Sequence, residues 1–468
     1  MSDLHFLTIA EASRLIAARK LSPIELTQAF IARVKALDPR LNAFILLMED
    51  SALAAARAAE ADIAAGRYRG PLHGIPIGLK DIYNTAGTAT TGHSALFRDH
   101  VPAEDAHTVA LLKAAGAIIL GKLATHEFAT GGPSFDLPWP PARNPWDLAR
   151  MPGGSSSGSG AAVAAGLCPG AMGTDTGGSI RFPAALCGIA GHKPTYGLVS
   201  RRGILPLSFS LDHGGPMCWT SEDCALMMDV LAGYDPLDPA SADVPKPDFL
   251  HGLSDGIAGM TIGAIRHFHE TDLDCDPEVA AAFEASVKAL EALGATVKPV
   301  TVSPLSHYGD VLNVISRAEA YSIHERHLTR TPMLYGALGR RRLAAGAFLR
   351  ASDYVSAVRH RGRLVAEMAA VMTDCDAVIT AGWHRPAPEF GEGAVPRGLN
   401  LTSVFNVTGS PALSVCNGFT AAGLPTALQI AARPFADPTA LRIGAAFEKA
   451  TAFRSRRPAF ATDAALAA

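Results

Sequence analysis

Short apolar segments alternate with helical patterns along most of this chain, and this alternation constrains its fold more than any other feature. The segments that resemble buried strands lie at 74–80, 117–120, 260–265, 377–380, 412–415 and 426–430. Apolar residues at helical spacing mark the stretches 221–232, 277–293, 309–328, 352–372 and 438–450. Strands that alternate with helices are typical of α/β proteins. We therefore expect a layered α/β/α fold around a mixed, mostly parallel, twisted β-sheet.

The chain has 468 residues, a length that allows one large domain or two. No internal repeat or low-complexity linker divides it, and the stretch 234–255, rich in Pro, Asp and Ala, is not a convincing boundary. We therefore expect a single domain over 1–468. Within it we expect N-terminal helices at about 8–65, a core that carries the polar motifs at about 70–235, and the second half of the sheet with pocket-forming helices at about 256–455.

The charge balance narrows the choice of partners. The formal net charge is −3, which disfavours a phosphate-binding surface and predicts no nucleic-acid partner. No apolar run reaches the roughly 20 residues that span a bilayer, and the N-terminus lacks the features of a secretory signal, so we expect no membrane association. Seven scattered cysteines without a C-x-x-C pair are typical of free thiols in a reducing compartment and predict a cytoplasmic protein.

Two stretches rich in glycine and serine stand out, at 152–160 and 173–181. Loops this dense in glycine allow close backbone approach and unusual backbone angles. Each runs into apolar residues, at 161–163 and 180–185, which indicates a loop that leads into a helix. Backbone N–H groups at such a junction form a ready site for an oxyanion, and a serine after two glycines is well placed to attack a carbonyl held there.

A serine hydroxyl is a weak nucleophile and needs a base. The one histidine near either stretch is His192, whereas Lys80 ends the apolar strand 74–80. A lysine in such a strand is partly desolvated, which lowers its pKa towards the neutral, proton-accepting form. The alternative is a solvated lysine, or one paired with the adjacent Asp81. The residue pattern alone leaves both interpretations open.

The strand Gly-Ile-Pro-Ile-Gly-Leu-Lys-Asp, the two serine loops and their spacing together resemble the amidase signature family. Lys80 precedes Ser155 by 75 residues and Ser155 precedes Ser179 by 24, as in well-studied members. The resemblance covers about residues 8–450, and its further matching stretches lie at 144–146, 192–200, 210–217, 406–412 and 423–425. It implies the amidase signature fold and an amidase that hydrolyses the C–N bond of a carboxamide without a cofactor.

The resemblance also implies a Ser–Ser–Lys triad. Ser179 would be the nucleophile that forms the acyl-enzyme. Ser155, which follows a cis peptide bond in the family, would relay its proton. Lys80 would be the base in acylation and would then pass the proton to the leaving amine.

Further site residues are implied in the same way. Four backbone N–H groups would form the oxyanion hole, those of Thr176, Gly177, Gly178 and Ser179. Ala129 aligns with a substrate-contacting position ahead of the first serine loop. Asp175 and Arg181 resemble structural partners that fix the second loop.

Departures from the family pattern leave the substrate open. Ser157 stands where many members have glycine, and the stretches 129–139 and 380–385 differ from the amidotransferase subunits. Pocket-lining residues cannot be read from the sequence within 130–139, 305–350 and 380–396. The expected partner is a small-molecule amide, with small aryl or alkyl amides favoured and anilides or carbamates chemically accessible. Family members are often dimers, so a homodimer is compatible with the resemblance.

No metal site is expected. The stretch His-Glu-Arg-His at 324–327 is one residue short of the H-E-x-x-H zinc motif. His267 and His269 alternate near the end of a predicted strand. We interpret these histidines as solvated surface residues.

Two alternatives belong to different classes. The stretch 154–158 also fits G-x-S-x-G, the nucleophile elbow of α/β-hydrolase esterases, which would make Ser156 the essential serine. The other alternative is the amidase subunit of a tRNA-dependent amidotransferase, which needs partner subunits and RNA. The near-neutral charge and the altered segment before the first serine loop argue against that role. Turnover of a simple amide by the isolated chain would discriminate.

Overall fold

One β-sheet runs through the computed structural model, which describes residues 4–391 and 399–462. Across the sheet the described strands follow the order β1-β3-β2-β4-β6-β5-β10-β11-β9-β7-β8. Their bounds are β1 Phe44–Leu47, β2 Pro76–Lys80, β3 Ile118–Leu123, β4 Gly170–Asp175, β5 Ala190–Lys193, β6 His213–Cys218, β7 Thr261–Ala264, β8 Thr296–Pro299, β9 Ala377–Ala381, β10 Ala412–Phe419 and β11 Pro425–Ala432.

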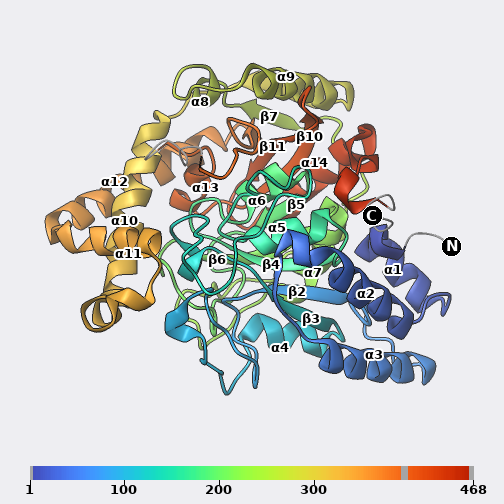
Figure 1. Cartoon of the computed structure of the whole chain (residues 1–468). Coiled ribbons are helices and arrows are strands. Elements are labelled where there is room, and N and C mark those ends of the chain that lie inside the picture. Colours follow the sequence, from blue (N-terminus) through green and yellow to red (C-terminus); the bar gives the residue numbers. More distant parts are fainter. Residues whose placement is uncertain (1–3, 392–398, 463–468) are drawn as a thin grey trace.

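Helices surround this sheet (Figure 1). Their bounds are α1 Ile9–Ala17, α2 Pro23–Leu41, α3 Glu49–Ala64, α4 His107–Ala114, α5 Ser157–Ala164, α6 Arg181–Cys187, α7 Ser221–Leu231, α8 His267–Glu270, α9 Pro277–Ala292, α10 Leu305–Arg330, α11 Ala337–Ala344, α12 Ala351–Val371, α13 Ser403–Val407 and α14 Asp437–Ala450. The short helices α5 and α6 pack against central strands, whereas α10, α11 and α12 form the orange group at the left of Figure 1. The expected α/β fold with a mixed sheet is confirmed.

The direction of the strands differs from the expectation of a mostly parallel sheet. Among the described strands, the parallel pairs are β2/β3, β2/β4, β7/β8 and β7/β9. The antiparallel pairs are β1/β3, β4/β6, β5/β6, β5/β10, β10/β11 and β9/β11. Parallel pairs need a crossover connection, whereas β10 and β11 are joined by the short turn 420–424 and must therefore run antiparallel.

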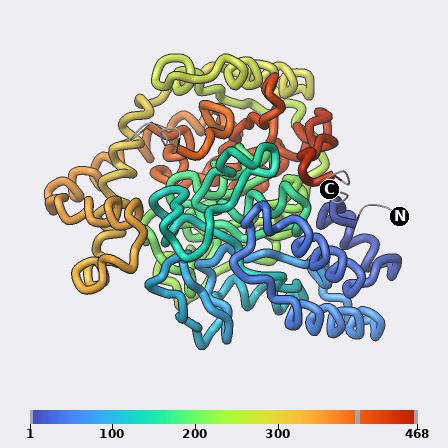
Figure 2. The backbone as a smooth tube through the Cα atoms, in the orientation of Figure 1, coloured from blue at the N-terminus to red at the C-terminus, as the bar shows by residue number. Residues whose placement is uncertain are grey.

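The two ends of the described chain lie side by side at one edge of the molecule (Figure 2). The Arg457 guanidinium donates to the carbonyl of Phe6 at 3.1 Å, and Arg33 of α2 donates to the carbonyl of Ala461. The last described residues are therefore hydrogen-bonded to the N-terminal helical segments. None of the described helices is long and apolar enough to cross a membrane.

Candidate active site

Lys80 is the last residue of β2 and is fully buried. Its Nζ atom lies 2.7 Å from Ser155 Oγ and 2.7 Å from Thr174 Oγ1. Thr174 belongs to β4, which is the neighbour of β2 in the sheet. The sheet therefore brings one lysine and two hydroxyl groups together from positions that are 75 and 94 residues apart in sequence.

The carboxylate next to Lys80 in sequence is not its partner. Asp81 Oδ1 lies 3.1 Å from Nζ of Lys122 on β3, and both side chains are fully buried. The other oxygen of Asp81 accepts a hydrogen bond from the N–H of Thr91 at 2.9 Å. The alternative in which Lys80 pairs with Asp81 is therefore wrong, because Lys80 has only hydroxyl partners among the described residues.

Burial sets the protonation of this lysine. Desolvation lowers the pKa of Lys80 to about 7, although the charges of Asp175 and Asp212 oppose that shift. At neutral pH, a large fraction of the protein molecules therefore carries Lys80 as a neutral amine. A neutral amine within hydrogen-bond reach of a hydroxyl group can accept its proton, which is the requirement for a general base.

Ser155 lies in the loop before α5, and the peptide bond between Gly154 and Ser155 is cis. His126 packs against this loop, and its backbone N–H donates to the carbonyl of Ser155 at 3.0 Å. A Cβ atom on Gly154 would lie 2.1 Å from the His126 ring, so this close approach requires glycine. Burial, with the charges of Lys80 and Arg342, lowers the pKa of His126 to about 3 and keeps its imidazole neutral.

Ser156, the nucleophile in the elbow alternative, is fully buried. Its Oγ donates to the carbonyl of Thr174 at 3.2 Å and accepts from the N–H of Thr174 at 3.2 Å. The backbone of β4 therefore engages this hydroxyl on both sides. The structure gives Ser156 a structural role and argues against the esterase alternative.

Ser179 lies in the loop that follows β4 and is partly exposed, unlike Ser155 and Ser156. Its carbonyl accepts a hydrogen bond from the N–H of Ser156 at 3.3 Å, which joins the two serine loops. Its hydroxyl donates to none of the described residues and is free to meet a ligand.

A buried ion pair braces the Ser179 loop, as expected for Asp175 and Arg181. The Asp175 carboxylate accepts from the N–H of Gly178 at 2.7 Å and lies 2.9 Å from the Arg181 guanidinium. Burial alone would raise the pKa of Asp175, but the charge and hydrogen bonds of Arg181 hold it below its usual value. Arg181 also donates to the side chains of Gln429 at 2.7 Å and Asn406 at 2.6 Å.

The four amides expected in the oxyanion hole divide into two groups. The N–H groups of Thr176, Gly177 and Ser179 donate to none of the described residues. The N–H of Gly178 instead donates to Asp175, which differs from the expectation. Three donors are therefore available for a ligand, and the fourth holds the loop in shape.

Side chains behind the loop set the direction of these amides. The carbonyl of Gly177 accepts from Asn400 Nδ2 at 2.6 Å and from Thr402 Oγ1 at 2.8 Å. Gly178 has a φ of +126°, and a Cβ atom there would lie 1.9 Å from Thr402 Oγ1. Glycine is therefore required at 178 for both backbone angle and space.

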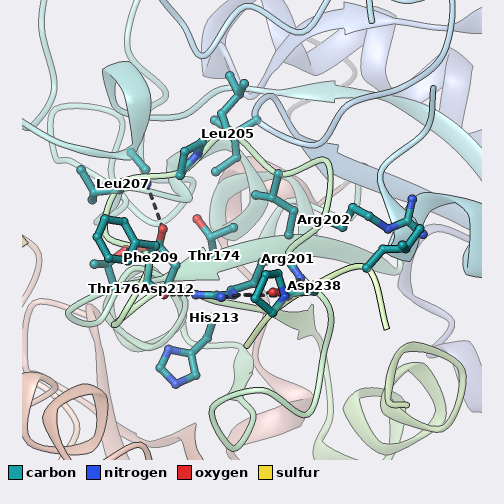
Figure 3. Close-up of a pocket in the computed structure, with 16 residues that line it drawn as sticks. Thr174, Thr176, Arg201, Arg202, Leu205, Leu207, Phe209, Asp212, His213 and Asp238 are labelled. Carbon is teal, nitrogen blue, oxygen red and sulfur yellow. Dashed lines mark hydrogen bonds and ion pairs between the residues drawn. The ribbon is translucent and has the colours of Figure 1, made fainter. Parts of the chain in front are cut away.

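Ala129 is buried and lines a cavity of about 190 Å³ together with Thr174 and Thr176 (Figure 3). Thr174 was not identified from sequence, although it lies inside the motif 173–181. Asp212 was missed too, and its Oδ1 accepts from Thr176 Oγ1 at 2.5 Å. Asp212 lies inside the matching stretch 210–217, but its role depends on a contact between two loops that the sequence does not show.

The described residues offer one group of candidate metal ligands, His269, Glu270 and Glu284. Glu284 already forms an ion pair with Arg266 through contacts of 2.7 and 3.1 Å, which opposes binding of a cation. His269 and His324 are buried, so the interpretation of these two as solvated surface histidines is wrong. His324 contacts the hydroxyl of Tyr335 at 3.0 Å.

The family model described as Amidase matches residues 25–441. The chain belongs to the amidase signature family. Members of this family act on the C–N bonds of amides, and this chain is an enzyme of that class.

This amidase is similar in sequence and structure both to amidotransferase subunits and to an aryl acylamidase. A glutamyl-tRNA(Gln) amidotransferase subunit of Chloroflexus aggregans (strain MD-66 / DSM 9485) is 38% identical over 98% of this chain and 99% of its own. The structure of the corresponding subunit from Thermotoga maritima is 35% identical, with a TM-score of 0.81 over 96% of each chain. A bacterial aryl acylamidase is 26% identical, with a TM-score of 0.87 over 98% of this chain and 100% of its own. The curated relative supports the amidotransferase alternative better than the free-standing amidase that we favoured from sequence.

The hypothesis that Lys80 is the base predicts the pH dependence of this amidase. Only the neutral lysine accepts a proton, and Lys80 becomes charged as the pH falls through its pKa of about 7. We therefore expect kcat/KM to rise about tenfold per pH unit below that value and to level off above it. A pH–rate profile with a simple amide tests this, and a profile that stays flat across neutral pH contradicts it.

Proposed function

We propose that this amidase cleaves a carboxamide through an acyl-enzyme on Ser179. Ser179 Oγ bonds to the carbonyl carbon while its proton passes to Ser155, whose own proton passes to neutral Lys80. The C–N bond then breaks as Lys80 returns a proton through Ser155 to the leaving nitrogen. Water cleaves the ester by the same path, so amide and water give acid and amine.

The contact of 2.7 Å between Lys80 Nζ and Ser155 Oγ carries this proposal. A charged lysine in that position could not accept a proton, whereas burial makes the neutral form accessible near pH 7. Ser179 supports the assignment because it is the partly exposed serine of the two loops, and its backbone contacts Ser156 beside Ser155. Substrate can therefore reach Ser179, while Ser155 stays buried with the base.

The oxyanion of the tetrahedral intermediate would lie against the free amides of Thr176, Gly177 and Ser179. Each donor of this kind typically contributes about 10²–10³-fold to kcat. Gly178 was expected as a fourth donor. We propose instead that its N–H acts through Asp175, by holding the loop in the shape that aims the other three.

The curated relatives favour the role of amidotransferase subunit for this chemistry. The relative from Chloroflexus aggregans is named as a subunit of glutamyl-tRNA(Gln) amidotransferase, and the similarity covers nearly all of both chains. In that role the released nitrogen would pass to a partner subunit, and the substrate would be an amide-nitrogen donor. Partner subunits and tRNA would then replace the expectation of no nucleic-acid partner.

A free-standing amidase for small aryl or alkyl amides is the second candidate. Its support is the backbone, which resembles the aryl acylamidase at a TM-score of 0.87 and the Thermotoga maritima protein at 0.81, despite the lower identity to the acylamidase. This candidate is a cytoplasmic enzyme, acting as a monomer or homodimer, with anilides and carbamates as further substrates.

Turnover by the isolated chain separates the two candidates. The purified protein would be incubated with glutamine, acetamide, acetanilide, a phenyl carbamate and phenyl acetate. Released ammonia or amine would be quantified for the nitrogen compounds, and released phenol for the ester. We expect steady turnover of acetanilide or acetamide if the enzyme is free-standing. Hydrolysis of glutamine and of none of the other compounds identifies the subunit role. Activity that appears only when partner subunits are added identifies it too. Gel filtration of the same sample reports whether it is a monomer or a homodimer.

A further inference from the structure

The acyl-transfer steps described above assign no occupant to the cavity of about 190 Å³. It lies beside the proton-transfer side of the site. Thr174, on its wall, accepts a hydrogen bond from Lys80, and Ile82, also on its wall, follows Lys80 by two residues. Thr176, at the oxyanion loop, lines it as well (Figure 3). A group on the nitrogen that receives the proton would therefore point towards this cavity.

Apolar side chains form most of its wall, among them Ile82, Ile204, Leu205, Leu207 and Phe209. Such a surface binds hydrocarbon, because each methylene group removed from water contributes about 0.8 kcal/mol in general.

Both arginines on the cavity wall form ion pairs, whereas Asp212 is held by hydrogen bonds. Arg201 lies 3.3 Å from Asp238, and Arg202 lies 2.9 Å from Asp235. Asp212 accepts from Thr176, and also from the N–H groups of the loop before it. On the described wall the two arginines and Asp238 are ion-paired and the Asp212 carboxylate is occupied by hydrogen bonds, so an uncharged group fits best.

The wall that carries Leu207 and Phe209 is held from outside by Glu319 of α10. This buried carboxylate accepts from Ser208 Oγ at 2.5 Å and from Ser210 Oγ at 2.7 Å. A loop fixed in this way forms its pocket before a ligand arrives, which reduces the entropy lost on binding.

We infer that this cavity binds an uncharged apolar substituent on the leaving nitrogen, so that the preferred substrates are N-alkyl or N-aryl amides. The inference rests on the proposed acyl transfer and on the free-standing candidate, since the subunit role would pass on the nitrogen and release no substituted amine. Size supports it, because ammonia needs about the space of one water, roughly 10–15 Å³, whereas this cavity has about 190 Å³. Ammonia as the leaving group would fill only a small part of that space.

Three amides test which part of the substrate enters the cavity. N-methylacetamide is the reference, N-butylacetamide adds three methylenes to the amine, and N-methylpentanamide adds three to the acyl group. Methylamine and butylamine have nearly equal basicity, so the first comparison isolates binding. We expect kcat/KM to rise about tenfold or more with the butyl amine, and less than about threefold with the longer acyl group.

Leu207→Asp places a charge in the cavity and is expected to bring the butyl-to-methyl ratio down to about one. Leu250→Asp is the matched control, since Leu250 is 40% exposed and does not line the cavity. It should keep the wild-type ratio.

Other outcomes overturn the inference. If Leu207→Asp changes the response to acyl length instead, the cavity holds the acyl group. If it changes neither ratio, or if none of the three amides is cleaved, the cavity does not select the amine. Labelling of Ser179 by phenylmethanesulfonyl fluoride is read in parallel. If Ser179 is labelled but the cavity assignment fails, the proposed acyl transfer is still supported. If Ser179 is not labelled, the result counts against the acyl transfer itself.

Discussion

Replacement of Ser179 by alanine is expected to lower kcat by about 10⁴-fold or more, with little effect on KM. The hydroxyl would supply the bond to the acyl group, and no neighbouring group can form that bond in its place. Fold and stability should be retained, because the side chain is partly exposed and bonds to none of the described residues. Steady-state kinetics with an amide, together with peptide mapping of a sulfonyl fluoride adduct, give the measurement.

Two serines of the other loop serve as comparisons for Ser179. Ser156→Ala should keep most of the activity, because the Ser156 hydroxyl serves only the backbone of Thr174. Ser155→Ala should be severely impaired, since the proton would have to cross to Lys80 without the relay. Turnover that survives in Ser179→Ala, or is abolished in Ser156→Ala, would move the nucleophile to the elbow serine.

Replacement of Lys80 by methionine is the second large effect, with an expected loss of about 10³–10⁴-fold in kcat and loss of the acid limb of the pH profile. The stability should change by no more than about 1 kcal/mol. Two hydrogen bonds are lost, each worth about 1 kcal/mol, but the desolvation of a potential charge is lost too. Initial rates across pH and thermal unfolding of the same sample measure both effects.

Lys122 is the matched control because it is a second fully buried lysine on the neighbouring strand. Lys122→Met leaves Asp81 as an uncompensated buried charge, which typically costs about 3–5 kcal/mol. The folded fraction should still show the wild-type pH profile. Loss of the acid limb in Lys122→Met, or its retention in Lys80→Met, would show that Lys80 is not the base.

Several strands rich in branched apolar residues were predicted from sequence, although β1 with the sequence Phe-Ile-Leu-Leu was missed, and the glycine-rich strands β4 and β6 were not predicted. β3 and β9 show the usual run of Ile, Leu and Val and were expected. β4 and β6 were missed, because their sequences Gly-Ala-Met-Gly-Thr-Asp and His-Gly-Gly-Pro-Met-Cys contain little that favours a strand. Packing demands this composition, since a Cβ atom on Gly215 would lie 2.4 Å from the carbonyl of His192.

In the candidate site, too, some residues could be predicted from sequence and others could not. The motifs located Lys80, Ser155 and the Ser179 loop, because each sits in a stretch of unusual composition. Asp212 and Glu319 were out of reach, since each acts through hydrogen bonds between elements that only the folded chain brings together. The desolvation that lowers the pKa of Lys80 was foreseen from its apolar strand, whereas the pairing of Asp81 with Lys122 required the register of β2 on β3.

Arg181 ties the reactive loop to a part of the protein that is synthesised much later. All three proposed catalytic side chains belong to the first 180 residues, yet the Arg181 guanidinium is held by Asn406 and Gln429, which follow it by 225 and 248 positions. A nascent or prematurely terminated chain would contain every reactive group and none of this support. We therefore expect hydrolysis to require the segment that carries Asn406 and Gln429 as well as the proposed catalytic residues.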